Sequence, residues 1–129
     1  MNQTLERLIG QLIIAGFRGS NAPPDSPIAN FIKDYNLAGV ILYDEDVKIG
    51  GLGSRNIQSP DQLKDLTDQL QSFSKDGLLI SIDQEGGGTN RLKSNYEFPE
   101  TPSWNHMGHL DNDLMTLQFS QTIASTLGD

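Results

Sequence analysis

Three short apolar runs, separated by segments with helical periodicity, constrain the fold of this chain more than any other feature. The runs are 12–17, 40–43 and 78–82. None alternates strictly between apolar and polar residues, which is typical of parallel strands covered on both faces. Strand–helix alternation with short connections predicts a parallel sheet joined by right-handed crossovers. We therefore expect an α/β fold.

The segments between the predicted strands carry helix signals. Ser26-Pro27 has the pattern of an N-cap followed by proline at the first helical position, and 59–62 (SPDQ) matches a capping box. Apolar residues then recur on one face of each helix. They are Ile28, Phe31, Ile32 and Tyr35 in the first helix, and Leu63, Leu66, Leu70 and Phe73 in the second.

Both ends of the chain also carry helical patterns. A short amphipathic helix with Leu5, Leu8 and Ile9 precedes the first strand, and Gly77 is placed to end the helix before the third strand. After a long loop, Asp111 or Asn112 can start a last helix. Its apolar positions are Leu114, Leu117, Ile123, Ala124 and Leu127.

Length and composition bound the protein class. The 129 residues predict one domain, 1–129, and the net charge of -8 argues against binding nucleic acid or an anionic membrane surface. The sequence has no cysteine, so disulfides and thiolate metal sites are excluded. No apolar run approaches membrane-spanning length, and no secretory signal is visible at the N-terminus. We expect a cytoplasmic location.

The segment 83–87 (DQEGG) directly follows the third apolar run. Acids and glycines at the carboxyl end of a buried strand occupy the place where α/β proteins bind ligands. Asp83 and Glu85 could form the carboxylate pair of a glycosidase, about 5–5.5 Å apart in retaining enzymes. The glycines bend the chain, so strand spacing cannot be assumed. We therefore do not assign Asp83 and Glu85 as the catalytic pair. The alternative is a capped strand end with solvent-facing acids.

The segment 81–92 (SIDQEGGGTNRL) resembles the strand and loop of glycoside hydrolase family 3, whose pattern is roughly IDQEGG-x-V-x-RL. Segments 9–17, 39–43 and 59–67 also resemble that family, in the right order, so the resemblance covers nearly the full chain. Within the family, the cytoplasmic single-barrel β-N-acetylhexosaminidases are most similar. Gly88 and Thr89 depart from the pattern, because family members often carry Arg, Lys or Pro and then Val at these positions.

The resemblance implies a (β/α)8 barrel, of which the chain would supply about three βα units, since a complete barrel needs ~250 residues. It implies that Asp83 binds sugar hydroxyls and that Arg91 holds Asp83 or the substrate in the same pocket. The role implied for Glu85 is structural. Neither the family's aspartate nucleophile nor the loop histidine of the hexosaminidases has a match here, so no catalytic residue is assigned. No cofactor or metal is implied.

His106 and His109 are the only histidines, and we interpret them as polar loop residues, because no third ligand for a metal lies near them in the sequence. Asp44 to Arg55 is interpreted as a long polar βα loop at the ligand-facing end of the barrel.

We therefore expect part of a retaining glycoside hydrolase acting on terminal β-linked sugars, N-acetylglucosaminides above all, with a carbohydrate substrate and no activity of this chain alone. An open barrel edge would favour self-association. Two alternatives remain: a small open-sheet domain that binds a ligand or protein without catalysis, and a β-glucosidase-type member of the family.

Overall fold

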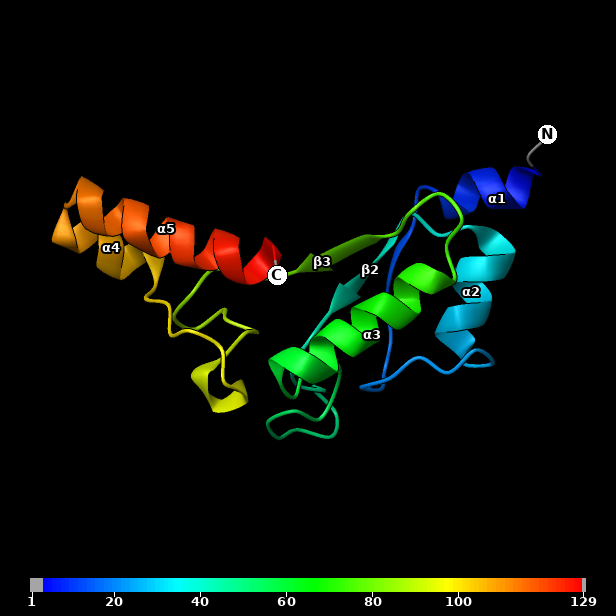
Figure 1. The fold of residues 1–129 in the computed structure, drawn as a ribbon, viewed down its shortest axis with the longest axis horizontal. Helices are drawn as coiled ribbons and strands as arrows, with labels where there is room; N and C mark the ends of the chain where they lie inside the picture. The colour runs from blue at the N-terminus through cyan, green and yellow to red at the C-terminus, as the bar shows by residue number, and fades with distance from the viewer. Residues whose placement is uncertain (1–3, 129) are drawn as a thin grey trace. The chain divides into compact units, whose positions relative to one another are not determined.

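A computed structural model describes residues 4–128 (Figure 1). These residues form two compact units, one ending at Ile82 and one beginning at Asp83. The first contains α1 (Leu5–Gly10), β1 (Ile14–Gly16), α2 (Pro27–Tyr35), β2 (Gly39–Leu42), α3 (Pro60–Ser72) and β3 (Leu79–Ile82). The second contains a 3-10 turn (Ser94–Tyr96), α4 (Trp104–Leu110) and α5 (Asp113–Gly128).

The strands form one parallel sheet in the order β1-β2-β3. Val40 at the centre is level with Ala15 of β1 and with Ile80 of β3. Each strand therefore adds beside its predecessor in the same direction, as in a (β/α)8 barrel. A doubly wound sheet would instead contain a point where the order reverses. The predicted α/β fold with a parallel sheet is confirmed.

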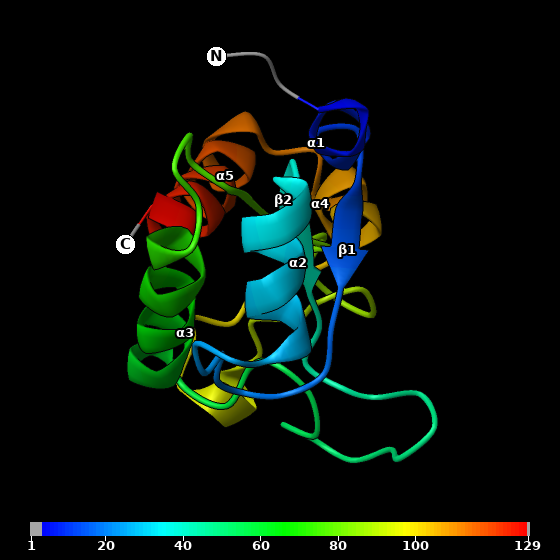
Figure 2. The same cartoon turned by 90° about the vertical axis from the view of Figure 1, so that its right-hand side faces the viewer.

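The core of the first unit lies between β2 and the helices. Val40 and Leu42 alternate to the same face of the sheet and are 0% and 2% exposed. Right-handed crossovers in a constant direction place α2 and α3 on that one face, and α2 lies across β2 in Figure 2. The helix residues that complete this core are Ile28, Ala29, Ile32, Leu66 and Leu70, all buried.

The opposite face of the sheet is open within the first unit, contrary to the prediction of strands covered on both faces. Ile14 and Leu79 flank Gly39 in register and are 50% and 63% exposed. The first strand is also shorter than the predicted 12–17. The backbone N–H groups of Leu12 and Ile13 donate to Ile9 and Gly10 carbonyls. The start of the apolar run therefore closes α1 instead of extending β1.

The predicted N-caps are confirmed. Ser26 Oγ accepts a hydrogen bond from Ala29 N, and Ser59 Oγ accepts one from Gln62 N. The apolar residues predicted on one face of α2 are only partly buried. Phe31 and Tyr35 are about half exposed, and their rings pack on each other with centroids 6.0 Å apart. Helix α3 ends at Ser72, and Gly77, with φ +87°, lies in the turn beyond it.

The second unit contains one helix that the sequence analysis missed. Helix α4 lies inside the segment predicted as loop. Its N-cap is Ser103, whose Oγ accepts a hydrogen bond from His106 N. The left-handed Asp111 ends α4, and Asn112 Oδ1 then accepts from Met115 N at the start of α5. No described residue of α5 is buried, whereas Leu92, Tyr96, Phe98 and Met107 are. The apolar core of this unit is therefore small.

Candidate functional site

The two residues predicted to bind substrate lie together in the second unit. Arg91 Nη2 is 3.7 Å from Asp83 Oδ2. The side chain of Arg91 is 26% exposed and that of Asp83 is 46% exposed. The pair is therefore held by the protein and still faces solvent. A carboxylate acceptor beside a guanidinium donor is suited to binding vicinal hydroxyl groups.

A tight reversal of the chain brings these residues together. The backbone N–H of Glu85 donates to the Thr89 carbonyl at 2.8 Å, and Gly86 and Thr89 form an antiparallel bridge. The chain after β3 therefore bends at once and returns beside itself. Glu85 itself is exposed. The strand spacing that would pair Asp83 with Glu85 does not continue past this bend.

The glycines of the loop have different roles. Gly86 and Gly87 adopt φ of +77° and +59°, a left-handed backbone that residues with a Cβ rarely adopt. A Cβ on Gly86 would lie 2.2 Å from the Pro102 carbonyl oxygen, and one on Gly87 would lie 2.5 Å from Ser103 Cβ. By contrast, a Cβ on Gly88 meets no atom within 4 Å. The first two glycines are required by the packing, and the third is not.

The side chain of Gln84 links the two halves of this loop. Its Oε1 accepts hydrogen bonds from Arg91 N at 3.1 Å and from Leu92 N at 3.0 Å. Its Nε2 donates to Asn90 Oδ1 at 2.6 Å. One amide thus satisfies three polar groups that lie six to eight residues further along the chain. We call these contacts the Gln84 clamp.

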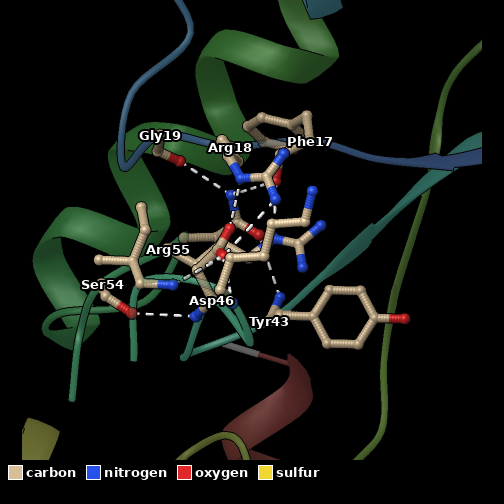
Figure 3. A network of polar contacts seen from close by, with 10 residues as sticks. Phe17, Arg18, Gly19, Tyr43, Asp46, Ser54 and Arg55 are labelled. Atoms are coloured by element: carbon tan, nitrogen blue, oxygen red, sulfur yellow. Dashed lines mark hydrogen bonds and ion pairs between the residues drawn. The ribbon is translucent and has the colours of Figure 1, made fainter. Parts of the chain in front are cut away.

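A second polar network follows β1 and β2 in the first unit (Figure 3). The Asp46 carboxylate pairs with the guanidinium of Arg18 and also accepts hydrogen bonds from Lys48 N at 2.9 Å and Ile49 N at 3.3 Å. The Asp46 N–H donates to Ser54 Oγ at 2.9 Å. The Arg18 hydrogen bond, followed by those from the backbone, lowers the pKa of Asp46 to about 2. Asp46 is 1% exposed, so this carboxylate fixes the loop.

Arg55 and Asn56 close the same loop against the segment after β1. Arg55 Nε donates to the Phe17 carbonyl at 2.9 Å, and its guanidinium lies 4.5 Å from the centre of the Tyr43 ring (Figure 3). Asn56 is fully buried, donates to the Gly19 carbonyl at 2.8 Å and accepts from Tyr43 N at 3.0 Å. These contacts satisfy backbone groups that helix and sheet leave unpaired.

The histidines of α4 form no metal site in the described chain. Within residues 4–128, no three His, Cys, Asp or Glu side chains are grouped so as to hold an ion. His109 Nδ1 instead lies 2.8 Å from the Asn105 carbonyl oxygen, one helical turn earlier. In the same range, no helix has both the length and the apolar character needed to cross a membrane.

Sequence reasoning singled out Asp83 and Arg91, which lie together, and their role stays a prediction. It did not single out Gln84, Arg18, Asp46, Arg55 and Asn56. Gln84 lies inside the motif that drew attention to the loop, and its position between the two acids was the available signal. The others pair with groups 28 to 38 residues away. No local pattern marks such contacts.

A parallel sheet in sequential order, with α2 and α3 as its crossovers, is the arrangement of a barrel-type α/β protein. The acid–arginine pair follows the third strand of this sheet. A family model described as the glycosyl hydrolase family 3 N terminal domain matches residues 4–127. The chain belongs to glycosyl hydrolase family 3.

The relatives of this chain agree with this assignment. A protein named beta-hexosaminidase from Nitrosomonas eutropha is 32% identical over 102 residues, which cover 71% of this chain and 29% of that protein. Another protein of that name, from Alkalilimnicola ehrlichii, is 45% identical over 51 residues, covering 38% of this chain and 15% of that protein. The chain therefore spans less than a third of these relatives.

Solved structures show the same likeness. A glycoside hydrolase family 3 beta-N-acetylglucosaminidase from Paenibacillus sp. superposes with a TM-score of 0.80 and 30% identity, covering 98% of this chain and 22% of that one. A beta-N-acetylhexosaminidase from Beutenbergia cavernae superposes with a TM-score of 0.68 over 97% of this chain and 36% of that one. At 21% identity, the second comparison supports the fold alone.

Proposed function

We propose that this chain supplies part of the saccharide pocket of a glycoside hydrolase that removes terminal β-linked N-acetylglucosamine. The observation that carries the proposal is the pairing of Asp83 with Arg91 in a solvent-facing loop at the carboxyl end of β3. Family membership and the names of the relatives support the reaction class. The alternative of a binding domain without catalysis has no comparable support.

In this proposal Asp83 accepts hydrogen bonds from sugar hydroxyls, and Arg91 both orients Asp83 and donates to the substrate. Charge-assisted hydrogen bonds of this kind are stronger than neutral ones. The retaining chemistry, with a covalent glycosyl-enzyme intermediate, requires a nucleophile that we do not assign to any residue of this chain. We also propose that residues 1–129 form part of a single barrel domain and that the protein acts in the cytoplasm.

Replacing Asp83 with alanine tests the proposal. In the protein that carries this chain, Asp83→Ala should lower kcat/KM for a chromogenic β-N-acetylglucosaminide about 100-fold, because two charge-assisted hydrogen bonds to the substrate would be lost. The melting temperature should change little, because exposed ion pairs contribute about 0–1 kcal/mol.

Asp65→Ala is the matched control, because Asp65 is an exposed acid on α3. Its kcat/KM should equal that of the wild type. Unchanged kinetics in Asp83→Ala would refute the assignment of Asp83. A preference of the wild-type protein for a β-glucoside over the N-acetylglucosaminide would instead favour the β-glucosidase-type alternative.

A further inference from the structure

The Gln84 clamp connects directly to both members of the acid–arginine pair. Asp83 precedes Gln84 in the chain, and the backbone N–H of Arg91 is one of the two that Gln84 Oε1 accepts. The ion pair joins residues eight positions apart, and the clamp bridges the same two stretches of backbone through a single side chain. The separation of the two Cα atoms of the pair therefore depends on the clamp.

The clamp uses three of the four hydrogen-bonding positions of the Gln84 amide. The oxygen accepts two backbone N–H bonds, and the nitrogen donates to Asn90, which is 8% exposed. An apolar side chain of similar length could fill the space but would leave buried backbone donors unpaired. Asparagine would be one methylene shorter. Glutamine therefore supplies the reach and both kinds of hydrogen-bonding group at this position.

We infer that Gln84 is a positioning residue for substrate binding. It fixes the position of the Arg91 backbone and thereby holds the Asp83–Arg91 pair in the geometry that binds the sugar. This inference rests on the proposed function. Arg91 has a long, flexible side chain, and its guanidinium is 3.7 Å from Asp83. A backbone displaced by about 1 Å would separate the pair, and misplacements of that size can reduce catalysis by up to about 100-fold.

The test compares Gln84→Met with Gln71→Met in the protein that carries this chain. Gln71 is a natural control, because its amide forms a similar clamp in the other unit. Its Nε2 donates to the Leu78 carbonyl at 2.7 Å, and its Oε1 accepts from Leu78 N at 3.0 Å. Each variant loses side-chain hydrogen bonds to backbone about seven residues further along the chain. Only Gln84 is next to the proposed sugar-binding pair.

We expect Gln84→Met to raise KM for the N-acetylglucosaminide about tenfold, as expected from lost hydrogen bonds near a binding group, with a smaller change in kcat. Gln71→Met should leave KM within about twofold of the wild type. Hydrogen exchange should speed up at the Arg91 and Leu92 amides only in Gln84→Met. Gln84→Glu keeps both acceptor contacts but loses the donation to Asn90. The Asn90 amide can turn and donate to the new carboxylate, so KM should stay within about threefold of the wild type.

The outcomes separate this inference from the proposed function. If Asp83→Ala impairs the enzyme while Gln84→Met loses amide protection without raising KM, the clamp is structural only and the inference fails. Equal KM increases in Gln84→Met and Gln71→Met, or in Gln84→Met and Gln84→Glu, would also overturn it. If Asp83→Ala has wild-type kinetics, the proposed function fails and the inference fails with it.

Discussion

The loops that follow β2 and β3 both carry acidic residues near their start, yet they hold their carboxylates in opposite ways. Asp46, after β2, is 1% exposed and accepts hydrogen bonds from an arginine and two backbone amides. Asp83, after β3, has a side chain 46% exposed and an arginine 3.7 Å away. A buried, fully coordinated carboxylate fixes a loop, whereas a half-exposed one has oxygens left for a ligand.

The two loops also differ in the range of their contacts. Asp46, Arg55 and Asn56 bind partners 28 to 38 residues away in the segment after β1. The loop after β3 is held by the Gln84 clamp, whose partners lie within eight residues. The first loop therefore depends on the tertiary fold of its unit, and the second is organised mainly by its own sequence.

The largest expected effect concerns the turn of the second loop. Gly86→Ala should destabilise the loop by about 3 kcal/mol or more, because a left-handed backbone at alanine is strained and its Cβ would collide with the Pro102 carbonyl. Hydrogen exchange across residues 84–92 and thermal unfolding would measure the loss. Gly88→Ala is the matched control and should be close to neutral, since its Cβ meets open space. Equal effects of the two substitutions would show that the turn is not fixed as described.

A smaller effect is expected from the buried amide of the first loop. Asn56→Ala should lower the free energy of unfolding by about 2–3 kcal/mol, because the Gly19 carbonyl and the Tyr43 N–H would lose their partner inside the protein. Asn90→Ala, which removes a single side-chain contact in the second loop, should cost about 1 kcal/mol. Urea unfolding gives both values. The reverse order would contradict the contrast between the two loops.

The most limited effect is a pH dependence of the first loop. Because Asp46 has a pKa lowered from 3.8 to about 2 in the folded protein, its ionised form stabilises the fold at pH above about 4. That stabilisation should be lost as the pH falls from about 4 towards 2, when the unfolded chain takes up the proton first. Urea midpoints measured across this range should fall in the wild type and fall less steeply in Asp46→Asn. Parallel curves for the two proteins would exclude Asp46 as the source.

The sequence predicted the features that depend on local chemistry. Serine–proline pairs marked the starts of α2 and α3, and apolar runs marked the strands. It failed where tertiary context decides. The apolar run at 12–17 is divided between a turn and a strand, and α4 begins at Trp104, after its N-cap Ser103, in a segment dense in loop formers. The partners of Asp46 and Asn56 are distant in the chain, so their roles emerge only from the fold.

The open position of Gly88 has a practical consequence. Residues 1–129 contain no cysteine, so Gly88→Cys would place the one thiol of this chain three residues from Arg91, at a site with room for an attached dye. Under the proposed function, fluorescence from that label should change when a saccharide binds, without any need for turnover.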